Sequence, residues 1–253
     1  MNKKILITGS TKGIGKGIAQ KFQENGWQVC ITGRNEQEVC GIVAEFNSIR
    51  RDSAIGLASD LGQAKGINRV KEFISNEWGF IDSMVLNIGS GSGTRGINSS
   101  FAENKELIDV NWVNPIKNFN IFVDLLQSTN PKTIIFIGSI AQEVNVGAPI
   151  AYSYSKRALN IFAKAAALNL SKSKISVNII NPGHIYTENG RWGHKKDRPQ
   201  GEFENFVSSN IPAGRIGTLE DVSSVILNLL ENTNPDFLTG ASLNLDGGTS
   251  LLI

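Results

Sequence analysis

The stretch Thr8-Gly9-Ser10-Thr11-Lys12-Gly13-Ile14-Gly15 decides the fold, because it joins an apolar run, Lys4 to Thr8, to a segment of helical period. Glycines at such a junction let the backbone turn tightly. They also let the amino terminus of a helix, with its unpaired N–H groups and partial positive charge, approach a pyrophosphate. A glycine triplet alone could be an ordinary turn. Its place after the first strand and at the start of a helix favours a dinucleotide-binding loop.

The rest of the chain repeats this alternation of short apolar runs and longer helical segments. The predicted strands are Lys4 to Thr8, Gln28 to Thr32, Ala54 to Ala58, Ser83 to Asn87, Thr133 to Ile137, Ser176 to Ile180 and Ser242 to Leu245. The predicted helices are Ile14 to Glu24, Glu36 to Ser48, Lys65 to Glu77, Lys105 to Ser128, Tyr152 to Leu170 and Leu219 to Glu231. Pro115 is expected to kink or split the fourth helix. The pattern predicts an α/β fold of Rossmann type, a doubly wound, mostly seven-stranded parallel sheet with helices on both faces.

Length and composition narrow the class of protein. A chain of 253 residues, 40% of them hydrophobic, can bury one large core, so we expect a single domain over residues 1–253. The net charge is +2, and no basic stretch is interleaved with aromatic residues, which argues against nucleic acid as a partner. No run approaches the ~18 apolar residues of a membrane span, so we expect a cytoplasmic protein. Cys30 and Cys40 have no metal-ligand company and predict neither a metal site nor a disulfide framework.

A second motif lies at the start of the predicted helix after the fifth strand. Tyr152 and Lys156 are four residues apart and share a helix face, whereas Tyr154 cannot share it. A tyrosine is a poor base near neutral pH, but a neighbouring positive charge stabilises its phenolate and lowers its pKa. Lys156 would supply that charge. The spacing alone also occurs by chance on helix surfaces, so its weight depends on the surrounding residues.

The glycine spacing, Gly-x-x-x-Gly-x-Gly rather than Gly-x-Gly-x-x-Gly, resembles the classical short-chain dehydrogenases/reductases, including enzymes like 3-oxoacyl-[acyl-carrier-protein] reductase. The resemblance covers nearly the whole chain. It implies that the Ser139 hydroxyl polarises a substrate carbonyl and that Asn111 holds a water in a proton relay from Lys156. It also implies that Pro182, Gly183, Ile185 and Thr187 hold the nicotinamide carboxamide. The implied catalytic set is Asn111, Ser139, Tyr152 and Lys156.

Arg34 bears on the choice of cofactor. An acidic residue about 20 positions after the glycines commonly binds the ribose of NAD, whereas an arginine there accommodates the 2′-phosphate of NADP. Gly33 leaves space, Arg34 offers a fork of donors, and Lys12 adds a second cation at a position often basic in NADP-using relatives. Glu36 is counter-evidence, and we expect it on the next helix, pointing away. NADP(H) is therefore favoured over NAD(H), with solvated charges as the alternative.

The resemblance completes the cofactor site with Asp60 and Leu61 against the adenine and with Asn87 and Gly89 along the trough. The predicted cofactor-binding residues are Gly9, Ser10, Lys12, Gly13, Ile14, Gly15, Arg34, Asn35, Asp60, Leu61, Asn87, Gly89, Tyr152, Lys156, Pro182, Gly183, Ile185 and Thr187. The chain departs from the usual Asn-Ala-Gly at Asn87-Ile88-Gly89, where Ile88 could narrow the pocket.

The substrate is less defined. Relatives carry a mobile lid where this chain has residues 188–211, and here that segment holds a basic cluster of Arg191, His194, Lys195, Lys196 and Arg198. Such a cluster could attract an anionic ketone, such as a sugar derivative or a carrier-linked 3-oxoacyl group, although a solvated loop is equally compatible. His184 and Trp192 could touch substrate but are expected to be packing residues.

These features predict an NADP(H)-dependent oxidoreductase that interconverts a ketone and a secondary alcohol, with Tyr152 as general acid or base. Two alternatives stay open. A non-catalytic scaffold could have lost Ser139, Tyr152 or Lys156, and this chain retains all three. An NAD-dependent epimerase usually carries an extra substrate domain, and Arg34 argues against NAD. The resemblance also implies a homo-oligomer, a tetramer or dimer, in which the tail Leu251-Leu252-Ile253 could pack across an interface.

Overall fold

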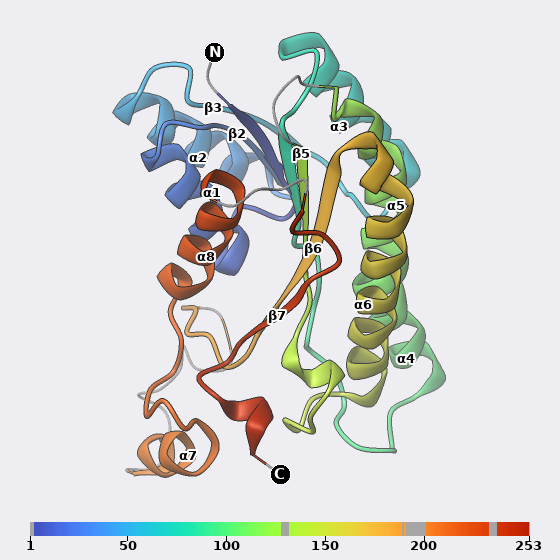
Figure 1. The fold of residues 1–253 in the computed structure, drawn as a ribbon, viewed down its shortest axis with the longest axis vertical. Helices are drawn as coiled ribbons and strands as arrows, with labels where there is room; N and C mark the ends of the chain where they lie inside the picture. Colours follow the sequence, from blue (N-terminus) through green and yellow to red (C-terminus); the bar gives the residue numbers. More distant parts are fainter. Residues whose placement is uncertain (1–2, 128–131, 189, 191–200, 233–236, 253) are drawn as a thin grey trace.

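One parallel sheet forms the centre of the protein. The computed structural model describes residues 3–127, 132–188, 190, 201–232 and 237–252. The strands are β1 (Lys4–Ile7), β2 (Gln28–Gly33), β3 (Ala54–Ala58), β4 (Ser83–Leu86), β5 (Lys132–Ile137), β6 (Ile175–Pro182) and β7 (Ser242–Leu245). All neighbouring pairs are parallel, and the strand order is β3-β2-β1-β4-β5-β6-β7 (Figure 1). The predicted seven-stranded, doubly wound sheet is confirmed.

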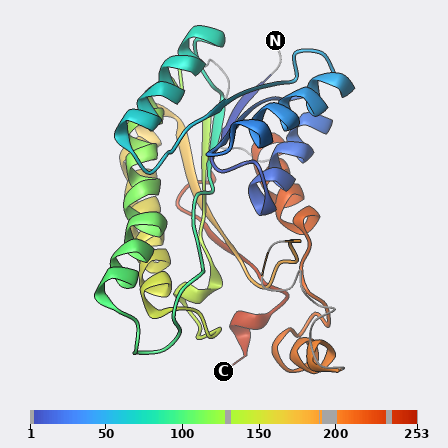
Figure 2. The ribbon, with the colours of Figure 1, turned by 180° about the vertical axis from the view of Figure 1, so that it is seen from behind.

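Helices cover both faces of this sheet (Figures 1 and 2). They are α1 (Gly13–Glu24), α2 (Glu36–Ile49), α3 (Ala64–Glu77), α4 (Phe101–Ile108), α5 (Asn114–Phe122), α6 (Ile150–Leu170), α7 (Glu202–Asn210) and α8 (Leu219–Glu231). Helices α1, α2 and α8 pack on one face, and α3, α5 and α6 pack on the other. None of the described helices is long and apolar enough to cross a membrane.

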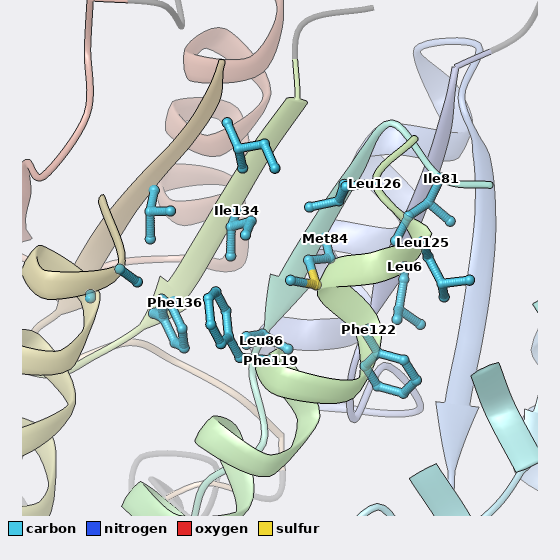
Figure 3. Close-up of a cluster of buried hydrophobic side chains, with 14 of the residues drawn as sticks. Leu6, Ile81, Met84, Leu86, Phe119, Phe122, Leu125, Leu126, Ile134 and Phe136 are labelled. Atoms are coloured by element: carbon cyan, nitrogen blue, oxygen red, sulfur yellow. The ribbon is translucent and has the colours of Figure 1, made fainter. Parts of the chain in front are cut away.

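The two faces have separate hydrophobic cores, because successive side chains of a strand point to opposite sides of the sheet. In β1, Leu6 faces the core under α3, α5 and α6, while Ile5 and Ile7 face the core under α1, α2 and α8. Figure 3 shows Leu6 with Met84 and Leu86 of β4 and Ile134 and Phe136 of β5, packed against aromatic rings from α5. Burial on both faces explains why central strands such as β1, β4 and β5 appear as continuous apolar runs in the sequence.

The predicted fourth helix, Lys105 to Ser128, needed correction. The helix begins earlier, at Phe101, where Ser100 and Glu103 form a reciprocal capping box. A single π-helical turn, Asp109–Val113, then separates α4 from α5, with Pro115 in the first turn of α5. The expected interruption at Pro115 is confirmed, because proline supplies no N–H to the preceding turn. The helix ends in a short 3₁₀ turn, Val123–Leu125, and Ser128 lies outside the described residues.

The strand order reverses between β1 and β4, which are neighbours in the sheet. The loops that follow them therefore meet: the Thr8 N–H donates to the Val85 carbonyl at 3.0 Å, and the Asn87 N–H donates to the Thr8 hydroxyl at 2.9 Å. This is the point where open α/β sheets bind ligands. In Figure 1 the carboxyl ends of the strands point downward, toward α7 and the carboxyl terminus.

Candidate active site

The glycine loop after β1 is shaped to let a phosphate reach the start of α1. Gly9 and Gly13 have positive φ values of 64° and 56°, a conformation that favours glycine. A Cβ on Gly15 would clash with the carbonyl oxygen of Gly9 and lie 2.5 Å from Asn87 Nδ2, so only glycine lets α1 approach this closely. Lys12 is the N-cap of α1, exposed and without a capping hydrogen bond from its side chain. The loop thus fits a dinucleotide pyrophosphate.

Ser10 is buried and holds the loop in place. Its hydroxyl donates to the Ile7 carbonyl at 2.8 Å and accepts from the Thr32 N–H at 2.9 Å, which links β1 to β2. Asn87 adds a second tie, because its Nδ2 donates to the Thr8 and Gly9 carbonyls at 3.1 Å each. The Ser10 side chain is therefore committed to the scaffold, and its contact with a cofactor stays a prediction.

Arg34 and its neighbours lie where the loop after β2 begins. Arg34 is exposed, and neither it nor Lys12 forms an ion pair with a described residue. Asn35 caps α2 by accepting from the Gln37 N–H at 2.9 Å. Glu36 is the first residue of α2, as expected. Two exposed cations are thus available beside the glycine loop for a phosphate.

Asp60 and Leu61 follow β3 and have different roles in the structure. Asp60 is exposed, and its Oδ1 accepts from the Gly62 N–H at 2.9 Å. The Leu61 side chain is buried in the core under α3, α5 and α6, while its carbonyl accepts from Asn118 Nδ2 at 2.8 Å. Most of the Leu61 side chain therefore packs in the core, and its predicted contact with adenine could involve only a small part of its surface.

The residues predicted to transfer a proton come together at the start of α6. Tyr152 and Lys156 share one face of the helix, with Lys156 Nζ 5.8 Å from the centroid of the Tyr152 ring. Lys156 is only 3% exposed, and its Nζ donates to the Ile137 carbonyl at 2.9 Å. The Tyr152 hydroxyl is hydrogen-bonded to Ser139, which follows the end of β5. Tyr154 points away and is 71% exposed.

Burial controls the ionisation of this pair. It lowers the pKa of Lys156 to about 8, because a buried ammonium loses its hydration. It also raises the pKa of Tyr152, an effect that the hydrogen bond from Ser139 partly offsets. In the protein alone the net direction is therefore opposite to the one expected from a neighbouring charge, because loss of hydration of the phenolate dominates. The effect of Lys156 on the pKa of Tyr152 stays a prediction.

Asn111 lies in the π-helical turn and fixes the loop after β4. Its Nδ2 donates to the Ser90 and Leu107 carbonyls at 2.8 and 2.9 Å, and its Oδ1 accepts from the Ser90 N–H at 3.0 Å. A Cβ on Gly89 would lie 2.9 Å from Asn111 Oδ1 and 3.1 Å from Lys156 Nζ. Gly89 thus lets Asn111 and Lys156 approach each other. The Asn111 amide is committed to this loop, so the relay water that the resemblance implies stays a prediction.

The turn after β6 brings the last predicted residues to the same edge of the sheet. Pro182 ends β6, and a Cβ on Gly183 would lie 2.6 Å from the Cβ of Asp246. Ile185 pairs with Gly217 in an isolated bridge. Thr187 Cγ2 lies 3.8 Å from the position that a Cβ on Gly13 would take. The turn therefore meets the glycine loop, as a site for one dinucleotide requires.

The described part of the predicted lid is a helix that the sequence analysis missed. In α7, Val207 packs against Ile211 and Ile216 in a small core of its own. His184 stacks edge-to-face on Phe206, with ring centroids 4.9 Å apart, in line with its interpretation as a packing residue. Ile88 likewise packs against the core under α3, α5 and α6. The basic cluster and Trp192 lie outside the described residues.

Sequence reasoning also missed Asn160, one helical turn beyond Lys156 on the same face of α6. Asn160 is buried, and its Nδ2 donates to Gln142 Oε1 at 2.6 Å. The signal in the sequence was its spacing of four residues from Lys156, but an asparagine at that position has no evident chemical role until its partner is known.

Comparison with known proteins places this arrangement in a family. The sequence model of the enoyl-(acyl carrier protein) reductase family matches residues 9–250. The 3-oxoacyl-[acyl-carrier-protein] reductase FabG of Buchnera aphidicola is 28% identical over 97% of both chains. Carbonyl reductase family member 4 of Xenopus tropicalis is 27% identical over 99% of both.

A solved structure gives the same result. The complex of Pseudomonas aeruginosa RhlG with NADP superimposes with a TM-score of 0.88 and 26% identity, covering 98% of this chain and 96% of that one. The seven-stranded parallel sheet with helices on both faces agrees with this structural match. The chain therefore belongs to the short-chain dehydrogenase/reductase family of oxidoreductases.

Proposed function

We propose that the protein is an NADP(H)-dependent carbonyl reductase that converts a ketone to a secondary alcohol, with Tyr152 as the general acid. One observation carries the proposal: the Tyr152 hydroxyl is bonded to Ser139 and lies beside a buried Lys156, at the sheet edge where the glycine loop and the turn after β6 meet. A pair on the helix surface would have neither the burial nor the Ser139 partner.

The mechanism follows from the positions of these groups. NADPH, held by the glycine loop, Arg34 and the turn after β6, would supply the hydride for the carbonyl carbon. The Ser139 and Tyr152 hydroxyls hydrogen-bond the carbonyl oxygen, and Tyr152 gives its proton to the oxygen as negative charge develops there. Donors aimed at such an oxyanion typically lower a barrier by ~3 kcal/mol. Lys156 stabilises the Tyr152 phenolate that remains. Because burial raises the pKa of Tyr152, the phenol is protonated at neutral pH, which supports the reductive direction.

NADP(H) is proposed over NAD(H) because two cations are exposed, Lys12 within the glycine loop and Arg34 directly after β2, while Glu36 is already part of α2. The relative RhlG, whose structure is an NADP complex, supports this choice. We also propose that residues 1–253 act as one domain in the cytoplasm.

The substrate is proposed to be a ketone with an anionic group, such as a sugar derivative or a 3-oxoacyl thioester. The names of the relatives, 3-oxoacyl-[acyl-carrier-protein] reductase among them, support an acyl substrate. The basic residues Arg191, Lys195 and Arg198 support attraction of an anion. Their joint replacement by alanine is expected to lower kcat/KM for an acidic ketone more than for a neutral one. If the triple variant lowered kcat/KM by the same factor for the acidic and the neutral ketone, or lowered neither, this assignment would be contradicted.

The decisive experiment is NADPH oxidation with a panel of ketones and diketones. Tyr152→Phe is expected to lose at least ~10²-fold in kcat while NADPH binding, measured by fluorescence, persists. Tyr154→Phe is the matched control, since it removes the same hydroxyl from an exposed position two residues away. If the wild type binds NADPH but turns over no carbonyl compound, the scaffold alternative is favoured. Epimerisation with catalytic NAD and no net NADPH oxidation would favour the alternative of an NAD-dependent epimerase.

A further inference from the structure

Two side chains of α6, one helical turn apart, hold the segment that carries Ser139 from both sides. Lys156 Nζ donates to the Ile137 carbonyl at 2.9 Å, before Ser139. Asn160 Nδ2 donates to Gln142 Oε1 at 2.6 Å, after Ser139. Gln142 ends the short 3₁₀ turn, Ile140–Gln142, that Ser139 caps. Since residues four apart share a helix face, the face that presents Tyr152 and Lys156 also clamps the turn next to Ser139.

Asn160 further connects this turn to the end of β6. Its amide also donates to the Ser242 hydroxyl of β7 at 3.2 Å. The same hydroxyl accepts from Asn181 Nδ2 at 2.9 Å, and Asn181 directly precedes the Pro182-Gly183 turn. One buried amide thus joins α6 to the Ser139 segment and, through Ser242, to the turn proposed to hold the nicotinamide.

The cluster has a cost in folding free energy. Asn160 Oδ1, Gln142 Nε2 and Asn181 Oδ1 are buried and have no hydrogen-bond partner among the described residues. Unsatisfied buried polar atoms destabilise a fold, whereas apolar side chains of similar shape at both positions of a pair can be neutral or stabilising. Stability alone therefore does not explain the Asn160 and Gln142 amides at this site.

We propose that Asn160 and Gln142 are positioning residues, which hold the Ser139 hydroxyl against Tyr152 and keep both in register with the turn after β6. The inference rests on the proposed function, because it assigns Ser139 and Tyr152 their roles. Without the amide bond, the segment keeps the tie from Lys156 to Ile137 but loses its tie from α6 to Gln142, and the Ser139 hydroxyl is expected to shift relative to Tyr152. A displacement of about 1 Å at reacting groups can cost on the order of 10²-fold in rate.

The first test separates positioning from stability. Asn160→Leu is expected to lower kcat by about 10- to 100-fold, with KM for NADPH changed less than about twofold. Because it leaves Gln142 Oε1 buried without its donor, it is also expected to lose some thermal stability, so a control with a similar loss is needed. Asn178→Leu is the matched control. Asn178 is also a buried amide, but it lies in the middle of β6, and it bonds Ser176, Leu238 and the Ala241 N–H. This control is expected to lose thermal stability and keep kcat.

The second test asks whether the bond itself matters. Asn160→Gln and Gln142→Asn each change the reach of one amide by one methylene, and each alone is expected to lower kcat. The double exchange restores the combined length of the two side chains and is expected to recover most of the lost rate. A double variant no better than the worse single variant would show that the amide pair is not the relevant interaction.

The third test needs no substrate. The chain has three tyrosines, so a Tyr154→Phe/Tyr186→Phe background leaves Tyr152 as the sole phenol. Its titration is followed by ultraviolet absorbance. Ser139→Ala sets the direction, because the Ser139 hydrogen bond favours the phenolate and its loss raises the midpoint. Asn160→Leu is expected to shift the midpoint the same way, and Asn178→Leu to leave it unchanged.

The outcomes distinguish the two proposals. An unchanged kcat and Tyr152 midpoint in Asn160→Leu, or an equal loss of kcat in Asn178→Leu, overturns the positioning role. If no ketone is turned over by the wild type, the proposed function fails, but the Tyr152 titration still decides whether Asn160 and Gln142 hold Ser139 in place.

Discussion

Lys156 combines a proposed catalytic role with a cost in stability, because its ammonium is buried and carries no described carboxylate partner. Lys156→Met is expected to raise the free energy of unfolding at pH 7 by on the order of 2 kcal/mol, while activity is lost. For a chain of this size that is several degrees in thermal midpoint. Differential scanning fluorimetry measures the shift, with Lys164→Met, an exposed lysine of the same helix, as the control.

The pH dependence of the same variant has a definite sign. The folded pKa of Lys156 is about 8, below its ordinary value of 10.5, so the unfolded chain binds more protons between these values. Stability of the wild type therefore gains a contribution as pH rises from about 8 toward 10.5, and the penalty is fully present below 8. The stability advantage of Lys156→Met should shrink over this range. An advantage that stays constant from pH 7 to 10 would contradict the low pKa.

Arg34 is expected to set the cofactor preference. Hydrogen bonds to a charged group contribute about 1.5–3 kcal/mol, so Arg34→Ala should weaken NADPH binding by at least about tenfold and leave NADH binding nearly unchanged. Titration of intrinsic fluorescence with each cofactor measures both constants. Arg51→Ala removes a nearly fully exposed arginine just beyond α2 and should change neither. A wild type that prefers NADH would contradict the assignment itself.

Residue positions were easier to predict than residue environments. The shared face of Tyr152 and Lys156 follows from helical spacing alone, and the structure shows it. The raised pKa of Tyr152 could not be predicted, because it depends on how deeply the tertiary packing buries the phenol. The hydrogen bonds of the Asn111 amide could not be predicted either. Ser90 is 21 residues away in the sequence, and Asn111 lies in a π-helical turn that the sequence pattern did not indicate.

At the scale of elements, strand and helix positions followed the apolar pattern closely, and the errors fell where a boundary depends on side-chain hydrogen bonds. The start of α4 at Phe101 depends on the Ser100–Glu103 capping box, a reciprocal side-chain hydrogen bond that the apolar pattern does not reveal. Helix α7 lies in a segment without a neighbouring strand, so the alternation that revealed the other helices gave no signal there. Its packing on Ile211 and Ile216 is local.

Replacing glycine by alanine is expected to have opposite effects on stability at Gly15 in α1, which lies close to the glycine loop, and at Gly41 in α2, which does not. Gly15→Ala places a Cβ against the Gly9 carbonyl, so it should destabilise the fold and weaken NADPH binding by more than about tenfold. Gly41→Ala, in the exposed middle of α2 with open space around it, should stabilise the fold by about 0.5–1 kcal/mol. Thermal unfolding and NADPH titration of both variants provide the measurement. Equal stability of the two would show that the Gly15 contact can relax.

For the whole molecule, the meeting of the loops after β1 and β4 was predictable, since it follows from the doubly wound order of a parallel sheet. Association between copies was implied only by family resemblance, and the structure adds a surface for it. On α6, Tyr154, Ile161 and Leu168 recur every seven residues and are 71%, 64% and 78% exposed. They form one apolar stripe about 20 Å long, and the segment that contacts α6 carries the partly exposed Ile108 and Trp112.

We therefore expect a homo-oligomer that buries this stripe. Exposure of the apolar side chains to water is unfavourable in free energy, and their seven-residue spacing allows them to pack against a helix of a second copy. Light scattering after size exclusion should give the wild type a multiple of the chain mass, and Ile161→Glu/Leu168→Glu a smaller species. Ile49→Glu is the control, since Ile49 is equally exposed but lies at the end of α2, on the other face of the sheet. A monomeric wild type would contradict association altogether. Dissociation by Leu251→Glu but not by the α6 variant would place the contact at the carboxyl-terminal tail, where Leu251 and Leu252 are also exposed.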